Sequence, residues 1–128
     1  MSLAVMAGAA GSHMLKSRLD AKALETFGTA QTFQVIHSLA LIILAIYVSK
    51  VRLSRLAVIS GWLFVSGLLL FSLPLYLIAL AGFKAGGAVA PFGGLCWIVG
   101  WALLGIDWLK LGRGTERPLV TNETDISS

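Results

Sequence analysis

The sequence predicts an all-α integral membrane protein, a bundle of four helices in which neighbours run antiparallel and the first helix is short. Of the 128 residues, 57% are hydrophobic and only 12% are charged, about half the charged share that is usual in soluble domains. The single cysteine excludes a secreted scaffold held by disulfides. The mean hydropathy of +0.86 excludes a disordered chain. A membrane protein of one domain remains.

Three uncharged runs are long enough to cross a bilayer. They comprise residues 26–49, 56–83 and 85–106. At about 1.5 Å of rise per residue they reach about 36, 42 and 33 Å, against a hydrocarbon core of about 30 Å. Helices are expected because so few segments cannot close a barrel, and lipid offers no partner to an open sheet edge.

Local signals set the expected helix ends. Asp20 is predicted to cap the second helix, and Pro74 predicts a kink in the third. Gly86, Gly87 and Pro91 predict a loop, with Pro91 as the first residue of the last helix. One domain is therefore expected over residues 1–112, with helices at about 2–14, 21–49, 56–82 and 91–111, followed by a polar tail at 113–128.

The last helix ends in polar residues that are expected to reach the membrane surface. Asp107 and Lys110 are predicted to extend to the interface, and Trp108 to lie in the aromatic belt.

Small residues recur where helices are expected to pack closely. Residues 1–15 carry no charged side chain, but they reach only about 22 Å as a helix. Small residues four apart let helix backbones approach, so we expect this segment to pack among helices rather than to face lipid. The predicted packing positions are Ala4, Gly8, Ser12, Ala90, Gly94 and Gly100.

Basic residues predict the orientation. Six flank one end (Lys50, Arg52, Arg55, Lys110, Arg113 and Arg117) and four flank the other (Lys16, Arg18, Lys22 and Lys84). The positive-inside rule then places the carboxyl terminus in the cytoplasm or the mitochondrial matrix. The cluster Lys50, Arg52 and Arg55 is also a candidate site for an anionic lipid such as cardiolipin, although a topology signal already accounts for it. No nucleic-acid partner is expected.

The two histidines are the candidate functional side chains, because ionisable groups are costly inside a bilayer. His13 closes the first segment, and His37 is expected one to two turns into the first long span, on the same side of the membrane. Together they could hold a haem or contribute to a metal site. We favour the alternative that each donates a hydrogen bond to a neighbouring helix, through Gln31, Gln34 or Ser38, with no cofactor and no metal bound.

Gln31, Gln34 and His37 share one polar stripe, which favours interhelical hydrogen bonding first and a proton path second. Cys96 is predicted to be an inert core thiol. The spans contain no Ser–His–acid set and no paired carboxylates. No enzymatic activity is therefore expected.

Four short patterns, in order along the chain, resemble the domain-of-unknown-function 423 family. They are Gly8-Ala-Ala-Gly-Ser-His13, Ile36-His37-Ser-Leu-Ala-Leu41, Gly67-Leu-Leu-Leu-Phe71-Ser-Leu-Pro-Leu-Tyr76, and Ala90-Pro91-Phe-Gly93-Gly94 followed by Gly100-Trp101. That family includes small bacterial inner-membrane proteins and the eukaryotic transmembrane protein 256 group, associated with mitochondria. The resemblance implies a four-helix membrane protein with no established activity. This chain departs from it in a shorter first helix and in Leu73-Pro74, where relatives commonly carry Gly-Ser.

The favoured function is a non-catalytic structural or accessory subunit in a larger membrane complex, with the respiratory chain as one candidate. Its location would be the mitochondrial inner membrane in a eukaryote or the inner membrane of a bacterium. Neighbouring chains are expected to cover the first helix or the tail. One alternative is a small oligomeric transporter or channel lined by the polar stripe. The less favoured alternative is a haem- or quinone-associated protein that uses His13 and His37.

Overall fold

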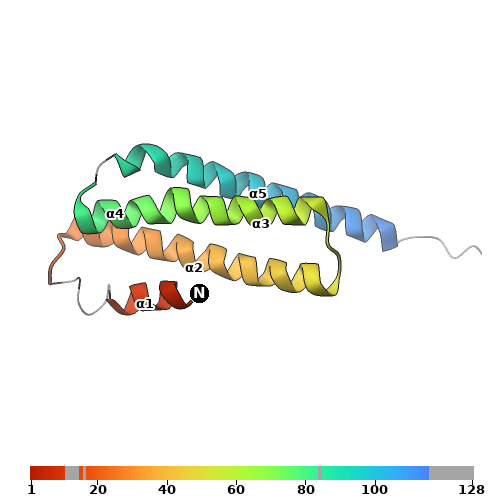
Figure 1. The fold of residues 1–128 in the computed structure, drawn as a ribbon, viewed down its shortest axis with the longest axis horizontal. Coiled ribbons are helices and arrows are strands. Elements are labelled where there is room, and N and C mark those ends of the chain that lie inside the picture. The colour runs from red at the N-terminus through yellow and green to blue at the C-terminus, as the bar shows by residue number, and fades with distance from the viewer. Residues whose placement is uncertain (11–14, 16, 84, 116–128) are drawn as a thin grey trace, which may run out of the picture.

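A computed structural model describes residues 1–10, 15, 17–83 and 85–115, and this part of the chain is helical without a strand. Three antiparallel rods form the body, and a short helix lies against one of them (Figure 1). The elements are α1 (Ser2–Ala10), α2 (Ala21–Lys50), α3 (Arg55–Gly67), η2 (Leu68–Ser72), α4 (Leu73–Ala81) and α5 (Gly86–Thr115). The predicted fold class is confirmed. The spans Ala21–Lys50, Arg55–Ala81 and Gly86–Arg113 are long and apolar enough to cross a membrane.

Local capping explains where α2 and α3 begin. The Asp20 carboxylate accepts a hydrogen bond from the backbone N–H of Ala23 at 2.7 Å. The Ser54 hydroxyl oxygen accepts one from Ala57 at 3.0 Å. Each satisfies a donor that the first helical turn leaves without a backbone partner. At the other end of α4, Gly82 adopts a left-handed conformation with φ +67°, which glycine tolerates without strain.

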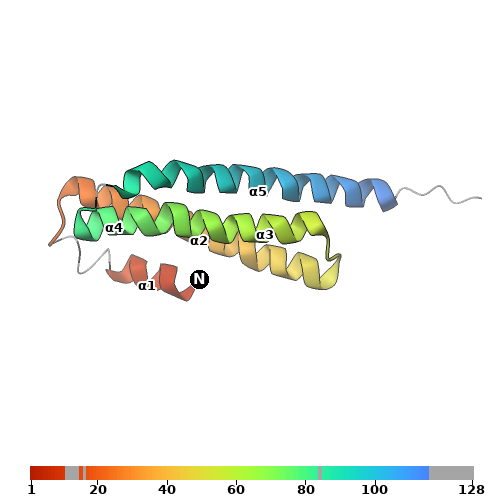
Figure 2. The ribbon, with the colours of Figure 1, turned by 45° about the horizontal axis from the view of Figure 1, so that its top comes forward.

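The rod formed by α3, η2 and α4 contains a π-helical turn where the sequence predicts a kink. The backbone N–H of Leu73 donates to the carbonyl of Leu68, five residues earlier. Pro74 follows directly, and a proline has no N–H to give to the carbonyl four residues before it. The widened turn therefore accommodates Pro74, and α3, η2 and α4 continue as one rod (Figure 2).

The last helix begins five residues before its predicted start. Gly86 to Ala90 are helical and Pro91 lies inside α5. A side chain at position 86 would stand 3.1 Å from both the Cβ and the carbonyl oxygen of Pro74. Gly86 thus lets α5 begin in close contact with α4, and this tertiary contact outweighs the preference of proline for the first helical position.

The other bounds lie near the expected ones. α2 ends at Lys50, and the α3–α4 rod covers residues 55–81. α5 continues to Thr115, four residues beyond the predicted end. α1 is described to Ala10, and the remaining predicted part of the first helix, residues 11–14, lies outside the described residues.

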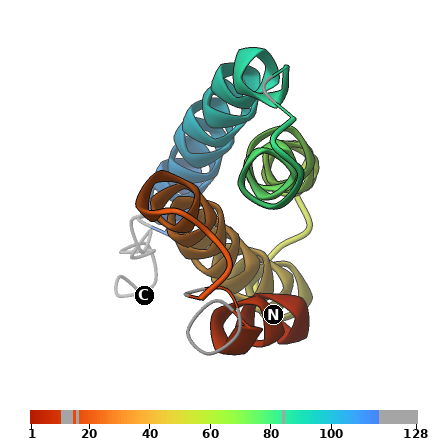
Figure 3. The same ribbon diagram turned by 90° about the vertical axis from the view of Figure 1, so that its left-hand side faces the viewer.

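The core lies where α5 packs on α2 and α3. Seen end-on, α2, the α3–α4 rod and α5 surround this core, while α1 lies outside it beside α2 (Figure 3). Buried residues of α5 recur three and four apart, which is the pattern of one helix face turned inward. They are Gly86, Ala90, Gly93, Trp97, Gly100, Leu104 and Asp107.

Glycine positions decide how closely the helices approach. A Cβ at Gly93 would lie 2.6 Å from the backbone nitrogen of Phe71, and one at Gly100 would lie 2.9 Å from the Phe64 ring. Gly94, which the sequence predicts as a packing position, has nothing within 4 Å of its Cβ direction. Within this chain the close approach is therefore made by the Gly93 face of α5, and no described helix packs closely at Gly94.

The remaining packing positions fall as follows. Ala90 is buried, and the side chain of Gln31 fills the space that a side chain at Gly8 would need. The Ala4 side chain and Ser12 lie outside the described residues.

Candidate functional site

The inner face of α2 carries a series of polar side chains, and three of them make hydrogen bonds to other helices. Gln34 pairs with Tyr76 of α4, His37 with Trp101 of α5, and Tyr47 with Asp107 of α5. Between them lie buried apolar residues of the same face, including Ala40 and Leu44. These pairs are the candidate functional site, because polar groups in a membrane helix are costly unless they are satisfied.

His37 occupies the middle of the bundle. It lies 16 residues after Ala21, the first residue of α2, which is more than four helical turns, whereas the sequence predicts one to two turns into the span. Its Nδ1 is 2.9 Å from the carbonyl oxygen of Phe33, and its Nε2 is 3.3 Å from the indole nitrogen of Trp101. A carbonyl can only accept and an indole N–H can only donate. The ring is therefore neutral, with its proton on Nδ1.

An aromatic cluster encloses His37, which is 4% exposed. The imidazole is stacked on Trp97 with ring centroids 3.7 Å apart and planes 7° from parallel. The indole N–H of Trp97 in turn donates to the backbone carbonyl of Phe64 at 3.2 Å. This contact requires Gly67, because a Cβ there would overlap the Trp97 ring. Other rings of the cluster are those of Phe33, Phe64, Phe71 and Trp101.

In this arrangement the Nε2 lone pair of His37, which iron or another metal would need, already accepts a hydrogen bond. Both ring nitrogens already make hydrogen bonds, and axial ligation needs one of them. His13, the other predicted ligand, lies outside the described residues. Within the described residues, no group of three or more His, Cys, Asp or Glu side chains could hold a metal ion.

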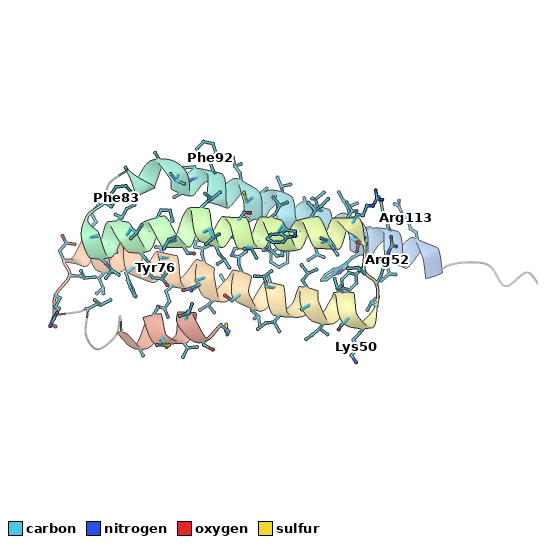
Figure 4. The ribbon with its side chains drawn as sticks, in the orientation of Figure 1. Lys50, Arg52, Tyr76, Phe83, Phe92 and Arg113 are labelled. Carbon is cyan, nitrogen blue, oxygen red and sulfur yellow. The ribbon has the colours of Figure 1, made fainter. Side chains whose placement is uncertain are left out.

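The predicted polar stripe does not line one path. Gln31 lies against α1 at Gly8, Gln34 accepts a hydrogen bond from the Tyr76 hydroxyl at 2.7 Å, and His37 turns toward α5. Tyr76 faces α2 from α4 (Figure 4). A mostly apolar cavity of about 470 Å³ adjoins the Gln34–Tyr76 pair. Its lining consists of Leu3, Met6, Ala7, Leu15, Phe27, Gln34, Tyr76 and Leu80.

Asp107 lies inside the bundle, contrary to its predicted place at the interface. Its side chain is fully buried, and one carboxylate oxygen, Oδ2, accepts a hydrogen bond from the Tyr47 hydroxyl at 2.8 Å. The other oxygen, Oδ1, is buried without a hydrogen-bond partner among the described residues. The spacing Trp97, Gly100, Leu104 is the sequence signal that points to this position as the next on the inner face of α5.

The end of the bundle beyond Asp107 is basic. Lys50, Arg52 and Arg55 are exposed at the junction of α2 and α3, and Lys110 and Arg113 are exposed on α5. Lys50, Arg52 and Arg113 lie at the same end in Figure 4. The predicted lipid-binding cluster is therefore joined by two cations from another helix.

Comparison with known proteins places the chain among membrane proteins of one family. A family model described as a protein of unknown function, DUF423, matches residues 7–94. A UPF0382 membrane protein of Staphylococcus saprophyticus is 38% identical over 109 residues, which cover 85% of this chain and 89% of that protein. A UPF0382 membrane protein of Bacillus subtilis is 31% identical over 108 residues, 84% of this chain and 88% of that protein. No solved structure matches this chain.

Proposed function

The chain belongs to the DUF423 family, and from this premise we propose that it is a non-catalytic subunit packed within a larger membrane assembly. It is an integral membrane protein of several spans. The proposal concerns what those spans do in the bilayer.

The observation that carries the proposal is the open side of α1. Among the described elements, only the backbone of α2 comes close to the backbone of α1. Its side chains Leu3, Val5 and Met6 are 72%, 63% and 66% exposed, and the cavity of about 470 Å³ lies between α1, α2 and α4. Lipid supplies no hydrophobic drive between helices, so such a surface gains energy only where a partner fits it. A helix from another chain would supply the missing contacts.

The subunit is proposed to be non-catalytic because its polar side chains are already used in pairs between helices. Each pair binds α2 to another helix, and both ring nitrogens of His37 are used. Hydrogen bonds between membrane helices contribute about 0.6 kcal/mol on average. They are suited to holding helices in register, as a packing subunit requires.

The proposed location is the inner membrane of a bacterium, because the relatives compared above are bacterial. They favour this location over the mitochondrial inner membrane. We propose that the basic end, and with it the carboxyl terminus, faces the cytoplasm, as the positive-inside rule requires. No contact of the described residues singles out a respiratory complex among membrane assemblies.

Photo-crosslinking in intact membranes tests the subunit role. A benzophenone amino acid placed at Leu3 or Met6 is expected to yield a protein adduct of higher mass. The matched control is Ile98, which is 67% exposed on α5 and turned away from the cavity; there, only lipid adducts are expected. Lipid adducts alone at Leu3 and Met6, together with a monomer in mild detergent, would contradict the proposal.

A further inference from the structure

We propose that the outer face of α3 at the basic end is a binding site for one anionic phospholipid. The site consists of Arg55, Val58, Ile59 and Trp62, and we call it the α3 stripe. It is independent of the subunit role, since it lies on a different helix from α1 and holds for a monomer as well as for an assembly.

The charge at this end is complementary to a phosphate. Five exposed cations gather there, contributed by the α2–α3 junction and by α5: Lys50, Arg52, Arg55, Lys110 and Arg113. Among the described residues, the only carboxylate at this end is Asp107, and it is buried against Tyr47. Among the described residues, no exposed acidic side chain therefore offsets the positive charge of this surface. An arginine offers a fork of N–H donors that matches phosphate oxygens.

The surface beneath Arg55 is apolar and hollowed. A depression of about 430 Å³ is lined by Leu53, Ser54, Arg55, Val58 and Ile59. Val58 and Ile59 are 43% and 47% exposed, and Trp62, one further turn along the same face, is 70% exposed. The residues are three and four apart, so they form one row.

The order of groups along this row matches a lipid and not a soluble anion. In the proposed site the guanidinium of Arg55 lies at the membrane surface, and Trp62 lies about 10 Å deeper along the helix axis. A phospholipid presents its phosphate and the upper part of an acyl chain in the same order and over a similar distance. A free phosphate would use the cations and leave the apolar row uncovered.

Quenching of Trp62 fluorescence by brominated lipid tests the site in the full chain. The protein is reconstituted in phosphatidylcholine with a minor fraction of brominated phosphatidylglycerol or, in parallel, brominated phosphatidylcholine. The contribution of Trp62 is the difference between the wild-type protein and Trp62→Phe, since the chain holds three other tryptophans. We expect brominated phosphatidylglycerol to quench Trp62 at a lower mole fraction than brominated phosphatidylcholine does.

Charge variants assign the preference to Arg55. Arg55→Gln is expected to lower the preference for phosphatidylglycerol about fivefold, the effect of one cation near a membrane surface, and Arg55→Lys to retain most of it. Quenching by brominated phosphatidylcholine should not change in either variant, which also verifies that the stripe is folded. The matched control is Arg18→Gln, an exposed arginine near the other end of the bundle, and it should leave the preference intact.

Three results would overturn the proposal. The first is equal quenching of wild-type Trp62 by the two lipids, and the second is an equal loss of preference in Arg18→Gln and Arg55→Gln. The third is loss of the preference on adding inorganic phosphate at constant ionic strength, because this would assign the cations to a free anion.

Discussion

The middle of the bundle and its basic end each hold a polar pair between α2 and α5, yet the two pairs are satisfied to different degrees. At the middle, both nitrogens of His37 have partners, and Trp97 stacks on the ring. At the basic end, Asp107 uses one oxygen for Tyr47 and leaves the other buried without a described partner.

The difference follows from what each side chain can offer its surroundings. A neutral imidazole has one donor and one acceptor, and the helices supply one group for each. A carboxylate has several acceptor sites, and no described residue donates a hydrogen bond to the second oxygen of Asp107. The middle of the bundle is therefore closed, in the sense that both ring nitrogens of His37 have hydrogen-bond partners. At the basic end, by contrast, one buried oxygen of Asp107 has no described partner.

The largest effect is expected when the Trp97 ring is removed from the middle of the bundle. Trp97→Ala removes the surface on which His37 stacks and the hydrogen bond to the Phe64 carbonyl. We expect the free energy of unfolding to fall by about 3 to 5 kcal/mol, measured by denaturant unfolding in mixed micelles. Trp62→Ala is the control, because Trp62 is 70% exposed, and a similar loss there would contradict the closed middle.

The next effect concerns the close approach of α5 to the α3–α4 rod. Gly93→Ala places a methyl group against the backbone of Phe71, which cannot move aside as a side chain can. Overpacking of this kind costs about 1 to 3 kcal/mol. Gly94→Ala, the neighbouring position with open space around it, should be neutral or slightly stabilising. If the two variants have equal thermal stability, α5 does not turn its Gly93 face inward.

A double-mutant cycle on Tyr47 and Asp107 examines the basic end. Tyr47→Phe removes the hydroxyl that donates to Asp107, and an unsatisfied buried group costs about 1 to 3 kcal/mol. Adding Asp107→Leu should restore part of this stability, because both positions then become apolar. Additive losses in the unfolding free energy would mean that the two side chains do not interact.

The smallest effect is expected at the hydrogen bond of the closed middle. Trp101→Phe keeps an aromatic ring beside His37 but removes the indole donor, which lies 3.3 Å from Nε2. The expected loss is about 0.6 kcal/mol, the average for a hydrogen bond between membrane helices. Tyr76→Phe, which breaks the bond to Gln34, should cost a similar amount. A loss in Trp101→Phe as large as that in Trp97→Ala would show that polarity, and not packing, closes the middle.

Sequence reasoning located the helices because their signals are local. The uncharged runs match the three spans, and Asp20 caps α2 as predicted. It did not locate the partner of His37. The sequence predicts that this side chain donates a hydrogen bond to a neighbouring helix, through Gln31, Gln34 or Ser38, whereas its Nε2 accepts one from Trp101 of α5. Which residues of two helices face each other depends on their rotation and register, and neither is written in the hydropathy of one segment.

The composition and the spacing of the charges were enough to establish a helical membrane protein with three helices long and apolar enough to span the bilayer, since lipid permits little else for uncharged runs of this length. The tertiary structure alone decided that α5 begins at Gly86, that Gly93 and not Gly94 makes the close contact, and that Asp107 turns inward. All three follow from the contact of α5 with the α3–α4 rod and with side chains of α2. A helix buries the face that fits its neighbours, and the shape of those neighbours comes from residues far away in the sequence.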